Sequence, residues 1–235
     1  MELATNISLL LLGISILVWG ANKFVDHASV IAKHMGISDL VIGLTLIAFG
    51  TSAPEIFVGI SSIINQNEEI ALGTAIGSNI SNIALIFGVS CLYLTGPSKT
   101  QLWNFVPFGL SVILLGLTLV DGKISFNESM GFVGILMIFM FVLFKTDGLA
   151  EEDSLDSSEF GHSLLVSLIG LVALITGANI AVIYAENTAL LLGVPQLIIG
   201  LTIIALGTSL PELAATIVAL KKGKHQMVVG NIIGS

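Results

Sequence analysis

Two stretches of this chain repeat one another: residues 41–55 read VIGLTLIAFGTSAPE, and residues 198–212 read IIGLTIIALGTSLPE. Eleven of the fifteen aligned positions are identical, at a constant offset of 157 residues. The same offset, without gaps, pairs further residues: Gly13 with Gly170, Gly20-Ala21-Asn22 with Gly177-Ala178-Asn179, Gly36 with Gly193, Gly73 with Gly230, and Gly77-Ser78 with Gly234-Ser235. Chance similarity between apolar segments would not keep Gly, Thr, Ser, Pro and Glu in register, so the sequence predicts an internal duplication.

The composition indicates a membrane protein. Of 235 residues, 54 % are hydrophobic and only 10 % are charged, and the mean hydropathy is +1.01. A soluble domain carries roughly 25 % charged residues, so this chain has too little polar surface to cover itself in water. The net charge of −8, without a large basic cluster, excludes a nucleic-acid partner. The single cysteine, Cys91, excludes an internal disulfide.

Long apolar runs predict an all-α integral membrane fold. We expect spans near residues 7–24, 40–64, 70–94, 102–120, 129–144, 163–184 and 196–220, with an eighth beginning near residue 227. Five spans separate equivalent points of the two copies, and five is odd, so the second copy crosses the membrane in the opposite sense. Such an inverted-topology repeat is an architecture of secondary transporters, with the site near the midplane where the repeats meet.

The same patterns give the domain organisation and the orientation. We expect a first repeat over residues 1–145, an acidic linker over residues 146–162, and the start of a second repeat over residues 163–235. An outer N-terminus places seven of the eight lysines in inner loops. The positive-inside rule therefore predicts that the N-terminus is outside and that the linker is cytoplasmic.

Two acidic residues, Glu55 and Glu212, lie deep inside predicted spans, at equivalent positions of the repeat. A carboxylate at mid-membrane costs on the order of 2.5–3.5 kcal/mol on insertion scales. No deeply placed Lys, Arg or His is available to neutralise the pair, so a bound cation, a proton or water must compensate the cost. The alternative is a pair of protonated glutamates that form interhelical hydrogen bonds.

Each copy of the motif presents four residues on one helix face, at i, i+3, i+4 and i+7: Ala48, Thr51, Ser52 and Glu55, and Ala205, Thr208, Ser209 and Glu212. Pro54 and Pro211 lack an amide hydrogen, so we expect nearby carbonyls, including those of the two alanines, to turn toward a cavity. Carboxylates, hydroxyls and carbonyls are hard oxygen ligands, which suit Ca²⁺ and Na⁺ rather than copper or structural zinc. For any single Thr or Ser, a hydrogen bond to its own helix is the alternative.

The segment GTAIGSNISN, which begins at Gly73, adds candidate ligands. Ser78 and Asn82 lie one helical turn apart and can present two oxygens to one point. Gly73 and Gly77 would let another helix approach closely, and simple helix packing is the alternative interpretation of the segment. The second copy of the pattern extends as far as Ser235.

Charge balance suggests how exchange can arise at such a site. Two ionised glutamates supply a charge of −2, which one Ca²⁺ neutralises, and several Na⁺ can occupy the same oxygens instead. Both loads cannot bind together without crowding positive charge at low dielectric. Mutual exclusion at one site is the minimal requirement for counter-transport.

The paired motifs closely resemble the two alpha-repeat signatures of the sodium/calcium exchanger family, within the cation/calcium antiporter superfamily. The resemblance is carried by the alpha-1 motif over residues 41–82 and the alpha-2 motif over residues 198–235, and it is greatest to compact prokaryotic members. It implies a fold of ten helices in two inverted five-helix halves, of which this chain covers about seven and a half. The remaining C-terminal helices would then be missing partners, and the chain would be a fragment.

The resemblance also implies an activity: exchange of Ca²⁺ for Na⁺ by alternating access in a prokaryotic cell membrane, without enzymatic activity or an organic cofactor. Four cation sites would cluster around the glutamates, and the first and sixth helices would slide against the others. The resemblance assigns ligand roles to Glu55, Glu212, Thr51, Thr208, Ser52, Ser209, Ser78, Asn82 and Ser235, and to the main-chain carbonyls of Ala48 and Ala205.

Other functions would use the same oxygens. A Ca²⁺/H⁺ exchanger or a potassium-dependent exchanger is the nearest alternative, although hydroxyls beside the glutamates favour bound metal ions over protons alone. A passive cation channel belongs to a different class, and it should pass current without any counter-ion gradient.

Overall fold

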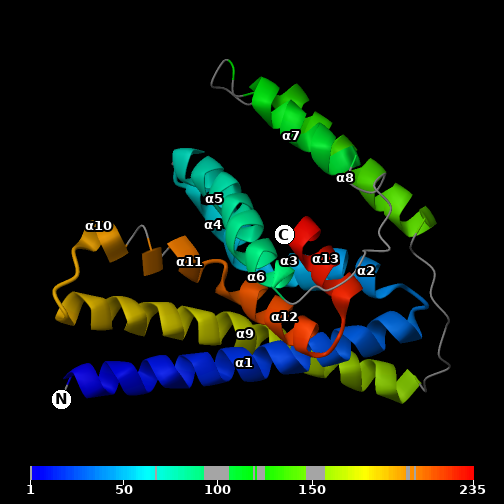
Figure 1. Cartoon of the computed structure of the whole chain (residues 1–235). Helices are drawn as coiled ribbons and strands as arrows, with labels where there is room; N and C mark the ends of the chain where they lie inside the picture. Colours follow the sequence, from blue (N-terminus) through cyan, green and yellow to red (C-terminus); the bar gives the residue numbers. More distant parts are fainter. Residues whose placement is uncertain are drawn as a thin grey trace.

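The computed structural model describes residues 2–66, 68–92, 106–118, 120, 125–146, 157–199, 202–203 and 205–235, and helices dominate these ranges (Figure 1). Four helical stretches are long and apolar enough to cross a membrane: Glu2–His34, Ala71–Cys91, Phe126–Lys145 and Glu159–Leu191. A bent pair, Asp39–Thr51 with Ala53–Ile64, forms a fifth candidate span. The all-α membrane fold is thus confirmed, whereas residues 147–156 of the expected acidic linker lie outside the described ranges.

Two long helices, α1 (Glu2–His34) and α9 (Ser157–Leu191), lie side by side and antiparallel along one edge of the molecule (Figure 1). A Cβ atom on Gly20 would collide with the Leu174 backbone and lie 2.7 Å from the carbonyl oxygen of Gly170. A Cβ on Gly177, the repeat equivalent of Gly20, would meet the Leu17 backbone in the same way. Glycines therefore allow the two backbones to approach closely. Equivalent glycines of the two copies each face the other copy's helix, as an inverted repeat requires.

The end of α1 differs from the sequence-based expectation, because the helix continues ten residues beyond the predicted span limit at Phe24, to His34. Val25, Ala28 and Ile31 in this extension are almost fully buried, whereas Asp26 is exposed. The extension is amphipathic and is held by packing of its apolar face. A hydropathy run cannot detect such a segment, because half of its residues are polar.

The first signature forms a broken helix. It passes through α2 (Asp39–Ile42), a π-helical turn η1 (Gly43–Ile47) and α3 (Ala48–Thr51), and continues after Ser52 as α4 (Ala53–Ile64), with a bend of 50°. Proline near the start of α4 has no amide hydrogen and cannot continue the ladder of α3, but it suits the first turn of a new helix. The sequence-predicted break at Pro54 is present.

The described parts of the second signature are α10 (Gln196–Ile199), α11 (Ala205–Gly207) and α12 (Leu210–Lys221). Ser209, at the junction before α12, has φ −90° and ψ 7°, close to the φ −83° and ψ 6° of Ser52. The two copies therefore fold alike at their prolines, as the internal duplication predicts.

Each signature is followed by a second helix: α5 (Glu68–Ser81), extended by η2 (Asn82–Phe87) and α6 (Gly88–Cys91), and in the second copy α13 (His225–Gly234). A Cβ on Gly230 would lie 2.8 Å from the Leu44 amide nitrogen, so α13 crosses η1 at close range. We also expected Gly73 and Gly77 to let another helix approach closely. Among the described residues nothing lies within 4 Å of a Cβ at either position, so for the first copy this stays a prediction.

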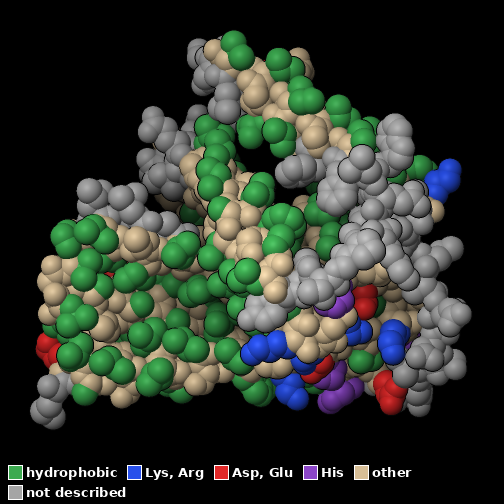
Figure 2. Space-filling model, in the orientation of Figure 1, with side chains coloured by type: hydrophobic (Ala, Val, Ile, Leu, Met, Phe, Trp, Pro, Cys, Tyr) green, Lys and Arg blue, Asp and Glu red, His purple; other side chains and the backbone are tan. Residues whose placement is uncertain are grey.

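A hairpin of α7 (Val106–Thr118) and α8 (Phe126–Thr146) stands apart from the other helices for most of its length (Figure 1). Leu143 of α8 is 1 % exposed and packs with Leu40, Val41 and Leu44. Elsewhere hydrophobic side chains cover much of the visible face of the molecule (Figure 2). Large apolar side chains exposed in the described structure include Leu11, Ile113, Phe141 and Val172. Such an apolar exterior is suited to lipid contact.

Charged residues gather instead where the turn between α12 and α13 meets the C-terminal half of α1 (Figure 2). Lys222 forms an ion pair of 2.5 Å with Asp26. Lys224 pairs with Asp39 at 3.3 Å and donates to the Ser29 hydroxyl at 2.6 Å. These contacts tie the second repeat to the first at one end of the helices.

The close α1–α9 contact predicts a strong effect of Gly20→Ala. The methyl group would overlap backbone atoms, which cannot move aside cheaply, and we expect a loss of about 1–3 kcal/mol in stability. Gly134→Ala in α8 is the matched control, because its Cβ would meet nothing within 4 Å of described atoms. Thermal unfolding of the purified protein in detergent measures both variants, and equal unfolding midpoints would contradict the proposed packing.

Candidate cation site

The two glutamates occupy matching places in the fold. Glu55 lies in the first turn of α4 and Glu212 in the first turn of α12, directly after the two helix breaks. Helix N-termini favour negative charge, because unpaired amide groups and the helix dipole point toward it. Glu212 is 2 % exposed, whereas Glu55 is half-buried. The breaks thus place two carboxylates inside the protein at favourable helix ends.

A hydrogen bond joins the two signatures directly. The Ser52 hydroxyl donates to Oε1 of Glu212 at 3.0 Å, although the two residues are 160 positions apart in the chain. Ser52 precedes Glu55 by three residues at the bend, so this contact brings the first signature against the carboxylate of the second. The Glu55 carboxylate is close enough to interact electrostatically with that of Glu212. The sequence-predicted convergence of the repeats is therefore seen at these side chains.

Several buried oxygens of the site have no hydrogen-bond partner among the described residues: both carboxylate oxygens of Glu55, Oε2 of Glu212, Oγ of Ser209 and Oδ1 of Asn82. A buried polar atom without a partner is costly, and a charged one more so. Within the same ranges no three His, Cys, Asp or Glu side chains converge. The arrangement therefore offers two carboxylates and neutral oxygens, a donor set suited to hard cations.

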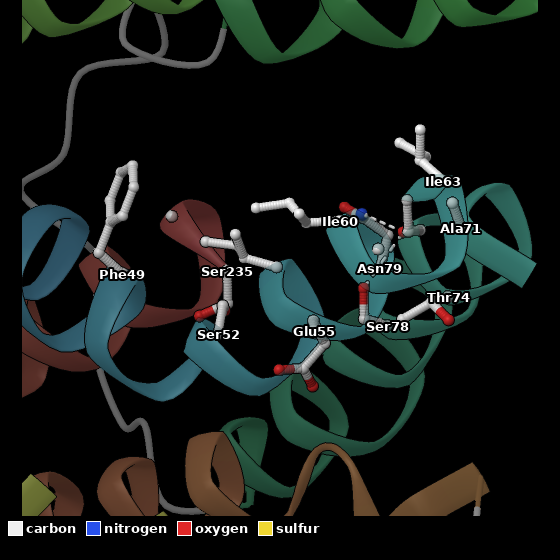
Figure 3. Close-up of a pocket in the computed structure, with 14 residues that line it drawn as sticks. Phe49, Ser52, Glu55, Ile60, Ile63, Ala71, Thr74, Ser78, Asn79 and Ser235 are labelled. Atoms are coloured by element: carbon white, nitrogen blue, oxygen red, sulfur yellow. Dashed lines mark hydrogen bonds between the residues drawn. The ribbon is translucent and has the colours of Figure 1, made fainter. Parts of the chain in front are cut away.

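A cavity of about 450 Å³ opens beside Glu55 (Figure 3). Its polar lining residues are Ser52, Glu55, Thr74, Ser78, Asn79 and Ser235. In Figure 3 the Glu55 carboxylate points away from the apolar side chains of Ile60 and Ile63. The cavity therefore combines an apolar wall with oxygens from α4, α5 and the end of α13.

Two polar lining residues, Thr74 and Asn79, were not predicted from the sequence. Thr74 lies one helical turn before Ser78, so the i, i+4 spacing used for Ser78 and Asn82 could have identified it. Asn79 gave no such signal. Its amide donates to the Ala75 carbonyl at 2.8 Å, and only the placement of α5 against α4 turns it toward the cavity.

Several of the predicted ligand hydroxyls donate a hydrogen bond to a carbonyl of their own helix, which was the alternative to a ligand role. Thr51 donates to the Ile47 carbonyl at 3.0 Å, Ser78 to Ala75 at 3.2 Å, and Ser235 to Asn231 at 2.7 Å. A hydroxyl that donates its one hydrogen still carries acceptor lone pairs. These bonds therefore fix the oxygens and leave them able to bind a cation.

Other predicted ligands lie differently. Thr51, Asn82 and Ser209 are buried away from the cavity lining, and Asn82 begins η2, which contacts α12. Thr208 is exposed, and Ala205 is the first residue of α11. For all of these residues the ligand role stays a prediction.

The structure differs from the expectation that the carbonyl of Ala48 is freed by the nearby proline. That carbonyl accepts the Ser52 amide at 2.9 Å and the Thr51 hydroxyl at 3.3 Å, so it is not freed by the proline. The reason is that Ser52 still closes the last helical turn of α3 before the bend.

Comparison with known proteins places the chain among transporters. The profile of the family described as sodium/calcium exchanger protein matches residues 5–145 and 162–235. The sodium/calcium exchanger MaX1 of Methanosarcina acetivorans is 32 % identical over 284 residues, covering 99 % of this chain and 79 % of its own length. The inner membrane protein YrbG of Escherichia coli is 33 % identical over 249 residues, covering 100 % and 76 %.

The fold comparison agrees with the sequence comparison. The solved structure of a sodium/calcium exchanger from Methanococcus jannaschii superimposes with a TM-score of 0.86 at 33 % identity, covering 99 % of this chain and 77 % of that one. The chain therefore spans about three-quarters of the length of these relatives.

The Ser52–Glu212 bond gives a prediction for Ser52→Ala. Loss of a hydrogen bond to a charged group costs about 1.5–3 kcal/mol, so we expect Ca²⁺ binding to weaken on the order of tenfold or more. Calorimetric titration of purified protein with CaCl₂ measures the change. Ser90→Ala is the matched control, since that buried hydroxyl donates only to the Ile86 carbonyl of its own helix, at 2.7 Å, in the described contacts. Equal weakening in both variants would exclude a specific role for Ser52.

Proposed function

The chain belongs to the sodium/calcium exchanger family, and we propose that it is an antiporter that exchanges Ca²⁺ for Na⁺ across a membrane. The observation that carries this proposal is the meeting of the two inverted motifs at the Ser52–Glu212 hydrogen bond. Three carboxylate oxygens of Glu55 and Glu212 have no partner there among the described residues. A pair of negative charges among apolar helices is stable only with compensating positive charge. The transported ions supply it.

Competition for one set of oxygens couples the two ions. One Ca²⁺ balances the two carboxylates, and Na⁺ ions balance them equally well when they use the surrounding hydroxyl oxygens. The cavity beside Glu55 provides room and further oxygens from Ser78 and Ser235. Because like charges repel strongly at low dielectric, Ca²⁺ and a full sodium load exclude one another. Each ion therefore leaves before the other binds, which is the basis of exchange.

Alternating access follows from the inverted repeat. The two halves have the same internal geometry in opposite directions, so an opening on one side has a counterpart on the other. We propose that α1 and α9 move together against the remaining helices, since their glycine contacts join them closely. This movement has to break or remake the contacts of Asp26 and Ser29 with the α12–α13 turn.

The orientation is part of the same proposal. With the N-terminus outside, the end of α1 and the α12–α13 turn are cytoplasmic, in agreement with the lysines of that turn. The predicted ligands that are not in the cavity lining, Thr51, Thr208, Asn82 and Ser209, would complete the site during ion binding. Coupling to H⁺ or K⁺, and passive conduction, are the alternatives that transport measurements separate.

Reconstituted vesicles test the coupling ion. With Na⁺ loaded inside and Ca²⁺ added outside, we expect rapid uptake of radioactive Ca²⁺, because the outward sodium gradient drives its entry. Replacement of the internal Na⁺ by choline should abolish uptake, and an imposed proton or potassium gradient should not restore it. Uptake that is indifferent to the sodium gradient would refute sodium-coupled exchange.

The two carboxylates are tested by Glu55→Gln and Glu212→Gln. Each variant removes one of the two negative charges that would balance a bound Ca²⁺. Since a buried charge that loses its opposite partner costs roughly 3–5 kcal/mol, we expect exchange to fall by at least about 100-fold. Glu159→Gln, an exposed glutamate in the first turn of α9, is the control and should transport normally. Sodium-driven uptake in vesicles is the measurement. Normal uptake by both site variants would remove these residues from the mechanism.

A further inference from the structure

The second half of the site contains a hydrogen-bonded bridge between two helices, formed by Asn231. Asn231 lies on α13 and is 2 % exposed. Its side-chain amide donates to the Thr216 hydroxyl at 2.9 Å and to the main-chain carbonyl of Glu212 at 3.3 Å, both on α12. A buried amide that bridges two helices fixes their spacing, because separation would leave buried polar groups without partners.

The same residue also contacts the last polar group of the cavity. The Ser235 hydroxyl donates to the main-chain carbonyl of Asn231 at 2.7 Å and lies 3.4 Å from the side-chain oxygen Oδ1 of the same residue. Asn231 therefore contacts two predicted ligand residues of the second repeat. It contacts the main-chain carbonyl of Glu212 and the side-chain hydroxyl of Ser235.

Among the described residues, the first repeat shows no equivalent bridge. Asn231 corresponds to Thr74 and Thr216 corresponds to Gly59, which has no side chain that could accept a hydrogen bond. A Cβ at Gly59 would meet nothing within 4 Å of described atoms, and Thr74 lines the open cavity. This asymmetry parallels the glutamates themselves, because Glu212 is buried and hydrogen-bonded whereas Glu55 is half-buried with both oxygens unpartnered in the described structure.

We propose that Asn231 is a positioning residue that locks α12 to α13, so that Glu212 and Ser235 form a rigid, pre-arranged half of the cation site. The Glu55 half, which lacks this bridge, adjusts to the ion that binds. The inference rests on the proposed ion binding, and it adds that the second repeat supplies the rigid half of the site and the first repeat the adjustable half. A pre-arranged half lowers the ordering cost of binding, so loss of the bridge weakens ion affinity without removing any ligand.

Asn231→Leu tests the bridge, because leucine is of similar size and cannot donate hydrogen bonds. With about 1 kcal/mol for each bond, we expect the dissociation constant for Ca²⁺, and the Ca²⁺ KM of exchange, to rise about five- to twentyfold. The maximal exchange rate should remain within about twofold, because every proposed ligand stays in place. Thr216→Val should give a smaller rise and Thr216→Ser almost none, since serine restores the accepting hydroxyl.

A general loss of folding would give a different pattern. Unfolding would lower the maximal rate and the amount of binding-competent protein, and Thr216→Ser would not differ from Thr216→Val. Amide hydrogen exchange of residues 210–216 gives a readout that does not depend on transport, and it should quicken in Asn231→Leu while the α1–α9 contact region is unchanged. The proposal would be overturned if Asn231→Leu left the Ca²⁺ dissociation constant unaltered. It would equally be overturned if the variant left amide hydrogen exchange of residues 210–216 unaltered.

The two proposals fail separately. If the wild-type chain binds Ca²⁺ but sodium gradients drive no uptake, the exchange function is wrong and the role of Asn231 is still measured by binding. If sodium-driven uptake is normal and Asn231→Leu leaves Ca²⁺ affinity unchanged, the exchange function stands and the positioning role is wrong.

Discussion

The constraint on which this structure depends is the cost of a carboxylate inside an apolar environment. Glu55 and Glu212 are carried on helices that must be predominantly apolar to cross a membrane. Neither takes part in the described ion pairs of Lys222 and Lys224, whose partners are Asp26 and Asp39. The protein reduces the cost locally, with helix N-termini and a hydroxyl donor, but three carboxylate oxygens have no partner among the described residues. In the proposed function, a bound cation compensates this remaining cost.

Inverted duplication solves a geometric problem that one copy cannot. A single broken helix presents one carboxylate on one side, and its partner must approach from the opposite direction to face it. The antiparallel contact of α1 and α9 holds the two copies in that relation, through glycines that exchange roles between the helices. The symmetry is not complete, however. Within the described ranges, Gly230 makes a close backbone contact that Gly73 does not, and the Asn231 bridge has no counterpart at Thr74.

The sequence predicted those features that depend on local chemistry and on the repeat. The duplication, the helix breaks at the prolines and the pairing of the two glutamates follow from residue types at fixed spacing. The extension of α1 to His34, the position of Asn79 and the bridge made by Asn231 depend instead on how helices pack, which periodicity does not encode. The sequence-based expectation that the proline frees the Ala48 carbonyl was wrong. The Ser52 amide still donates to that carbonyl and closes the last turn of α3 before the bend.

Neither of the two junction serines, Ser52 and Ser209, provides the local stability that a serine at a helix start can give. A serine at a helix N-terminus ordinarily accepts a hydrogen bond from an amide of the first turn, a cap whose loss costs typically about 1 kcal/mol. Ser52 and Ser209 stand at this position before α4 and α12, yet neither caps its helix in the described structure. Ser52 donates to the glutamate of the other repeat, and the buried Ser209 hydroxyl has no partner there. Since the same residue gives up the same cap in both copies, its oxygen is better explained by a ligand between the repeats than by the stability of either helix.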